Sequence, residues 1–116
     1  MRKIIGDQGE VTIFQIDAIP ENVKTRPATQ FNDKGQAIIS HSETGHHHVL
    51  TGGEVLERTD APNGMQQFYA IFKNAERLVQ DAPTPHEAHD LPAGLYEFRV
   101  AREYDPFLEQ ARLVRD

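Results

Sequence analysis

The feature that most restricts the fold of this chain is a series of short segments rich in β-branched and aromatic residues, each bounded by turn signals. No segment carries an apolar helical stripe over three turns. Short strands at this spacing are typical of a β-sandwich or a β-barrel. The predicted strands are residues 11–17, 36–43, 46–50, 54–58, 65–73, 75–80 and 95–100, and residues 105–116 form either a short helix or a further edge strand.

Glycine and proline place the connections between these strands. Residues 60–64 end in Asn63-Gly64, a pair that tolerates positive φ, and residues 20–35 hold enough Pro, Gly and polar residues to form a loop. The 116 residues fit one domain, which can bury roughly two-thirds of the surface that the unfolded chain exposes. We therefore expect a single all-β domain over residues 1–116, a barrel or sandwich of seven or eight short antiparallel strands.

Charge and composition argue against several classes of protein. The chain carries 12 Lys and Arg against 18 Asp and Glu, a formal net charge of -6, and no basic cluster, so we expect no binding to nucleic acid. No apolar stretch is long enough to span a membrane, and no apolar region follows the charged N-terminus as in a signal peptide. We expect a cytoplasmic protein that does not bind membranes. Because cysteine is absent, any metal site must use imidazole, carboxylate or water.

Histidine is strongly concentrated in this chain. Four of the six histidines fall within eight positions, and the other two lie within four. An even scatter would not give this pattern, and imidazole is the commonest metal ligand in proteins. The histidines are His41, His46, His47, His48, His86 and His89. We interpret them as the basis of a metal site.

The first histidine cluster predicts a metal-binding face if Thr44-Gly45 is the tip of a two-residue hairpin. Side chains at alternate strand positions share a face, so His41 would lie opposite His48, and His47 would point away. A bulge would move His41 to the other face. The side chains expected on the shared face are those of His41, Glu43, His46 and His48.

The second cluster supplies further ligands. Three-residue spacing puts His86 and His89 on one face of a helical turn but on opposite faces of a strand. We expect His86 to be the third ligand and His89 the second choice, with Glu87 or Asp90 orienting an imidazole. Histidine and carboxylate sites suit zinc, iron, copper, manganese and nickel alike, so we expect a divalent ion without specifying it. Solvated surface histidines are the alternative interpretation.

Two motifs of the chain resemble those of the cupin superfamily of small β-barrels. The segment from Gly45 to His48 is similar to the His-x-His pair of the first cupin motif, with Glu54 as the downstream acid. Pro92-Ala93-Gly94 is similar to the Pro-x-Gly turn of the second motif, although Glu97 stands where that family has histidine and Ala101 where it has asparagine. The resemblance covers roughly residues 36–100. It implies a cupin-like barrel with His46 and His48 as ligands and a last ligand from elsewhere, such as His86.

The chain is also similar to a group of small uncharacterised bacterial and phage-associated proteins. The shared features are a Thr-Gly-His-x-His run, a later histidine, a Leu-Pro-x-Gly-x-Tyr turn and strand, and an Arg-Glu-Tyr-Asp-Pro segment. Here these are residues 44–48, His86, residues 91–96 and residues 102–106. This resemblance covers most of the chain and favours His46, His48 and His86 over the other histidines, but it implies no activity.

Two functions of different class stay open, and neither identifies catalytic residues. The first is a metal-dependent enzyme of cupin type that acts on a small molecule in an enclosed pocket. The second is a non-catalytic binding or assembly module whose histidines hold a structural ion or an ion shared between subunits. Because small β-barrels often pair through edge strands, we expect a homo-oligomer. The expected partners are thus a small-molecule ligand and a second copy of the chain.

Overall fold

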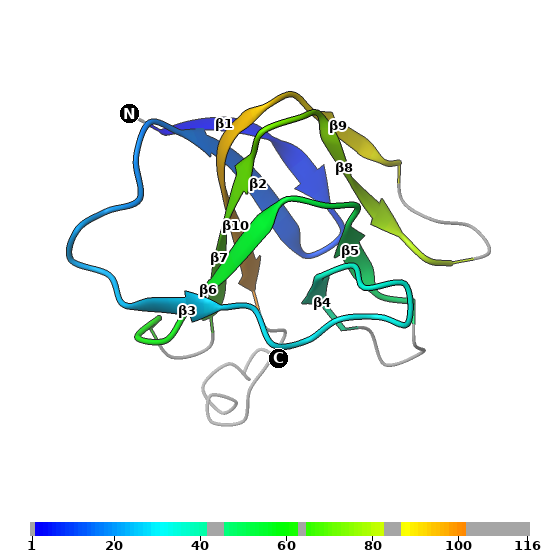
Figure 1. Ribbon diagram of the computed structural model, residues 1–116, viewed down its shortest axis with the longest axis horizontal. Coiled ribbons are helices and arrows are strands. Elements are labelled where there is room, and N and C mark those ends of the chain that lie inside the picture. Colours follow the sequence, from blue (N-terminus) through cyan, green and yellow to red (C-terminus); the bar gives the residue numbers. More distant parts are fainter. Residues whose placement is uncertain (1, 42–45, 63–64, 83–86, 102–116) are drawn as a thin grey trace, which may run out of the picture.

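The computed structural model describes residues 2–41, 46–62, 65–82 and 87–101, which form ten strands in two sheets (Figure 1). Every strand pairing is antiparallel. The prediction of an all-β fold is confirmed, and the architecture is a sandwich rather than a closed barrel. The strands are β1 (Arg2–Gln8), β2 (Val11–Ile16), β3 (Thr25–Pro27), β4 (Ile38–Ser40), β5 (His48–Leu50), β6 (Glu54–Arg58), β7 (Met65–Phe72), β8 (Glu76–Gln80), β9 (His89–Leu91) and β10 (Gly94–Ala101).

The chain passes repeatedly between the two sheets. The first sheet has six strands in the order β1-β2-β10-β7-β6-β3, and the second has four in the order β4-β5-β8-β9. The chain changes sheet after β3, β5, β7 and β9, so residues far apart in sequence meet between the sheets. Within the described residues, no helix is long and apolar enough to cross a membrane.

Periodicity predicts strands that overlap seven of the ten described here and misses β1, β3 and β9. The strand expected at residues 54–58 matches β6, and the strand expected at residues 65–73 extends one residue beyond β7. β1 is exposed along most of its length, and β3 and β9 have three residues each. Such strands have little buried face, so the alternation that marks a strand in sequence is absent. The expectation for residues 105–116 lies outside the described residues.

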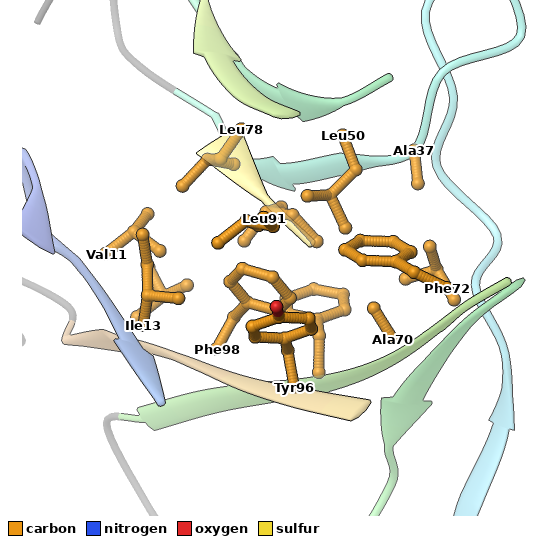
Figure 2. Packing of buried hydrophobic residues seen from close by; sticks show 14 residues of the cluster. Val11, Ile13, Ala37, Leu50, Ala70, Phe72, Leu78, Leu91, Tyr96 and Phe98 are labelled. Carbon is orange, nitrogen blue, oxygen red and sulfur yellow. The ribbon is translucent and has the colours of Figure 1, made fainter. Parts of the chain in front are cut away.

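The main core fills the space between the sheets (Figure 2). Inward-facing positions alternate along the long strands, as on β10, where Tyr96, Phe98 and Val100 are all buried in this core. Leu50 and Leu78, which pair across β5 and β8, face these rings from the second sheet. Full burial of a side chain of this size contributes about 1.5–3 kcal/mol, so the core is the main source of stability.

The outer face of the six-stranded sheet buries a second, smaller cluster. Phe14 and Ile16 on β2 pack there with Tyr69 on β7. Ile19 and Val23, from the connection between β2 and β3, pack against them. β2 and β7 are therefore buried on both faces, and β7 contains an apolar run of five residues, 68–72, in place of strict alternation.

A buried tyrosine fixes the turn between β9 and β10. The Tyr96 hydroxyl donates to the carbonyl oxygen of Pro92, four residues upstream, at 2.7 Å. This is the arrangement of a tyrosine corner, in which a phenol ties a strand to the backbone of the preceding turn. Burial raises the pKa of Tyr96, so the phenol remains a hydrogen-bond donor throughout the neutral range.

Gly53 and Gly35 form a matched pair for testing how tightly the turns pack. Both have positive φ, 90° at Gly53 and 79° at Gly35. A Cβ at Gly53 would overlap the ring of Phe72, whereas a Cβ at Gly35 would meet no atom within 4 Å. We predict that Gly35→Ala lowers the free energy of unfolding by about 1 kcal/mol and Gly53→Ala by about 2–4 kcal/mol, because only the second substitution adds overpacking to backbone strain. Urea unfolding measures both, and equal losses would contradict the packing argument.

Candidate functional site

A tight turn brings two polar side chains to one edge of the sandwich. Gln8 ends β1 and pairs with Val11 of β2, and two residues close the turn between them. Gly9 has φ 60°, and Glu10 does not have a positive φ. Glycine at the first of two turn positions is the pattern of a type II′ hairpin, whose twist matches that of its strands. The turn therefore places Glu10 directly beyond the end of β1.

The side-chain amide of Gln8 connects the two sheets. Gln8 is 1% exposed, and its Nε2 donates to the carbonyl oxygens of Leu78, at 2.9 Å, and Glu87, at 3.1 Å. Both amide hydrogens are then used, and Oε1 remains as an acceptor. It accepts from Nδ1 of His48 at 2.7 Å. These contacts fix the orientation of the amide and assign a proton to Nδ1 of the imidazole.

His48 lies between the sheets on β5 and is 1% exposed. Its Nε2 is 3.5 Å from Oε1 of Glu10. The second carboxylate oxygen of Glu10 accepts a hydrogen bond from the hydroxyl of Ser40 on β4. The Glu10 side chain keeps 38% of its surface exposed, so solvent reaches the pair from the carboxylate side. We call Gln8, Glu10, Ser40 and His48 together the His48 cluster.

In the His48 cluster two hydrogen-bond acceptor atoms face each other, Nε2 of His48 and Oε1 of Glu10. In the neutral tautomer that Gln8 selects, Nε2 of His48 carries a lone pair, and the facing oxygen of Glu10 is also an acceptor. A positive charge between the two atoms stabilises such a pair, either as a proton on Nε2 or as a cation. Two ligand atoms at about 2.1 Å from one tetrahedral zinc ion lie about 3.4 Å apart. The observed distance of 3.5 Å is close to this separation.

His41 and His47 form a separate pair, and the predicted pairing of His41 with His48 is wrong. Ser40 lies opposite His48, so the register of β4 and β5 differs by one residue from the one that the expected hairpin gives. A shift of one residue moves a side chain to the other face of the sheet. His41 instead contacts His47, with ring centroids 4.6 Å apart in an edge-to-face arrangement. Nδ1 of His47 is buried and has no hydrogen-bond partner among the described residues.

His46 and His89 each bond to a backbone carbonyl. Nδ1 of His46 donates to the carbonyl oxygen of Asp81 at 2.9 Å. Nε2 of His89 donates to the carbonyl oxygen of Asp7 at 2.7 Å, and its ring lies so close to Gly6 that a Cβ there would be 2.9 Å from Cε1. The His89 contact joins β9 to β1, at the edge where the two sheets are also joined by the His48 cluster.

The predicted ligands are therefore not all gathered in one place. Among the residues that the structure describes, no three His, Asp or Glu side chains lie close enough together to hold a metal ion. His48 has a carboxylate beside it, whereas His41, His46 and His89 have the separate contacts given above. His86, Glu43 and the Thr44-Gly45 tip lie outside the described residues, so the metal hypothesis stays a prediction.

Glu97 lies on the outer face of the six-stranded sheet. It alternates with the core residues Tyr96 and Phe98, so its side chain points away from the core, although it is only 3% exposed. There it accepts hydrogen bonds from Gln67 at 2.8 Å and from Arg99 at 2.7 Å. The position where the cupin resemblance expects a metal-binding histidine is thus occupied by a buried ion pair outside the core.

Three members of the His48 cluster do not follow from sequence patterns alone. Gly9 lies between the short apolar run Ile4-Ile5 and the apolar segment that begins at Val11. This pattern is a signal for the hairpin that holds Gln8 and Glu10. The charged and polar residues of β1 obscure this signal. The place of Ser40 depends on the register between β4 and β5, which residue spacing does not encode.

The fold and the His48 cluster define the class of this domain as an antiparallel β-sandwich with an imidazole and a carboxylate facing each other at one edge. The chain belongs to the family described as Domain of unknown function (DUF8820), whose family model matches residues 7–101. The match runs from the end of β1 to the end of β10 and includes the whole His48 cluster. No curated protein and no solved structure matches the chain significantly.

The titration of His41 reports on its contact with His47. Desolvation lowers the pKa of His41 below its ordinary value of 6.5, and the neighbouring His47 ring lowers it further. We predict an NMR titration midpoint below 6.5 for His41, and a higher midpoint that is still below 6.5 in His47→Gln, because desolvation is the larger cause. Since the pKa is depressed in the folded state, His41 lowers stability as the pH falls from 6.5 through the folded pKa. A midpoint at or above 6.5 in the parent would contradict this environment.

Proposed function

We propose that this domain binds a divalent metal ion, with His48 and Glu10 as ligands. The observation that carries the proposal is the 3.5 Å separation between Nε2 of His48 and Oε1 of Glu10. A metal-binding imidazole usually donates its other ring N–H to an oxygen, and Gln8 supplies that oxygen here. Ligating carboxylates are likewise hydrogen-bonded, as Glu10 is to Ser40. The donor set and its supporting contacts therefore fit a metal site.

One imidazole and one carboxylate leave coordination positions for other ligands. In this proposal His86 supplies one of them, since it directly precedes Glu87, whose carbonyl oxygen accepts from Gln8. Imidazole and carboxylate ligands suit zinc, iron, manganese, nickel or copper. A bound ion would supply a positive charge that can polarise a coordinated water or ligand. The chain's own residues would hold the ion and keep the imidazole in the required tautomer.

Zinc binding tests the proposal. Untagged protein is loaded with zinc, and its affinity is measured by competition with a chromophoric chelator. We predict that Glu10→Gln, which keeps the shape of the side chain, weakens zinc binding by at least about tenfold, because it removes a charged ligand. Glu10 is part-exposed, so this variant is expected to stay folded, and the far-ultraviolet circular dichroism spectrum checks this.

His89→Gln is the matched control, because His89 bonds to a carbonyl oxygen and has no part in the proposed site. Its zinc affinity should equal that of the parent. The proposal fails if His89→Gln and Glu10→Gln weaken binding equally. It also fails if the parent, after supplementation with each candidate metal, retains less than about 0.2 ions per chain by elemental analysis.

The second candidate function is an assembly module whose ion is shared between subunits. The observation that favours it is the edge strand β1, where Ile4 is 65% exposed and Ile5 is 37% exposed. An unpaired edge with apolar side chains can pair with a second copy of the chain. We predict for this function a dimer in sedimentation velocity that dissociates when the metal is chelated and that is weakened by Ile4→Lys. A monomer with and without metal would leave the site within one chain and exclude this alternative.

A further inference from the structure

A large cavity lies at the edge of the first sheet that is farthest from β1. Its volume is about 540 Å³, and its lining comes from β3, β4, β6 and the start of β7. Sites for small molecules usually measure roughly 300–1,000 Å³, so the cavity is large enough for an organic ligand. None of the residues of the His48 cluster lines it.

The rim of the cavity is rich in groups that both donate and accept hydrogen bonds. Gln30 and Gln66 line it with side-chain amides that make no hydrogen bond to another described residue, and both residues are exposed. Thr29 and Thr59 add hydroxyl groups that donate to Glu57 and to the carbonyl oxygen of Lys24, so their oxygens remain as acceptors. The amides can pair with a donor or an acceptor of the ligand, and the hydroxyl oxygens accept from a donor. The rim therefore matches a ligand whose polar groups can both donate and accept hydrogen bonds, as the hydroxyl groups of an alcohol do.

The charges at the cavity are already compensated within the protein. Nε of Arg26 donates to Glu57 at 2.6 Å, and the other oxygen of Glu57 accepts from Thr29. Nε of Arg58 donates to Asp60 at 2.7 Å, which lowers the pKa of Asp60 and keeps the pair ionised. Each cation thus has its own carboxylate. An anionic ligand would have to compete with these ion pairs, so a neutral ligand fits better.

The buried part of the lining is mainly apolar, apart from Gln67, whose side-chain amide already bonds to Arg58 and Glu97. Ile38, Ile39 and Phe68 line the cavity, and each is less than one-tenth exposed. An apolar wall opposite a hydrogen-bonding rim suits a ligand with one C–H face and several hydroxyl groups. A wholly apolar ligand would leave the amides of the rim without partners, at a cost of about 1–3 kcal/mol for each buried group.

We propose that this cavity is a binding site for a neutral saccharide. The rim amides and hydroxyls bind the sugar hydroxyl groups, and the apolar wall packs against the C–H face of the ring. The site is independent of the proposed metal site, since the two share no residue.

NMR titration with neutral disaccharides tests this inference. The ¹⁵N-labelled full chain is titrated with maltose, cellobiose, lactose and diacetylchitobiose, and separately with glucose 6-phosphate and an uncharged tripeptide. We expect saturable shifts of the backbone amides of Thr29, Thr59 and Gln66 with at least one neutral disaccharide. Gln30→Ala and Gln66→Ala should each weaken its binding by about three- to tenfold, the effect of one lost hydrogen bond.

Gln15→Ala is the matched control, because Gln15 is an exposed glutamine on β2 that does not line the cavity. Its affinity should equal that of the parent, and all three variants should keep the parent's spectrum outside the cavity, since none of these amides has a hydrogen-bond partner in the described part of the chain. The inference is overturned if no neutral disaccharide shifts these amides at tens of millimolar. Tighter binding of glucose 6-phosphate or of the tripeptide would also overturn it.

Discussion

The side-chain amide of Gln8 is the contact on which the polar edge of this sandwich depends. Buried between the sheets, it satisfies at the same time the carbonyl oxygen of Leu78 on β8, that of Glu87 just before β9, and an imidazole nitrogen of β5. A buried group left without a partner costs about 1–3 kcal/mol, so the three contacts hold one another in place. The tautomer of His48, and with it the nitrogen that faces Glu10, follows from this one amide. The chemistry at the edge is therefore decided by a neutral residue rather than by its charged neighbours.

The parts of the fold that the sequence predicts are those in which one face of a strand is buried. Residues 95–100 alternate strictly, because Tyr96, Phe98 and Val100 face the core while Glu97 and Arg99 do not. The sequences of β1 and β3, which lie at the two edges of the first sheet, show no such alternation of apolar and polar residues. The choice between sandwich and barrel depends on which edges pair across long distances in the chain, and local patterns do not encode this.

The candidate site is less predictable than the fold, and the reason is geometric. The histidine concentration correctly draws attention to residues 41–48, but the face on which each ring lies depends on strand register. In the folded chain Ser40, rather than His41, lies opposite His48, and His41 contacts His47. The carboxylate partner, Glu10, comes from a turn some forty residues away in sequence, and only the folded chain brings it to His48. Neither this register nor this approach can be predicted from residue spacing.

The two edges of the sandwich differ in the kind of contact that joins the sheets, and this difference has a dynamic consequence. At the β1 edge, hydrogen bonds from Gln8 and His89 cross between the sheets. At the β3 edge a cavity lies among residues of β3, β4, β6 and β7, and β3 itself is exposed throughout. Local openings of a protein follow its least protected contacts. Local openings should thus occur at the β3 edge more readily than at the β1 edge, where these hydrogen bonds hold the two sheets together.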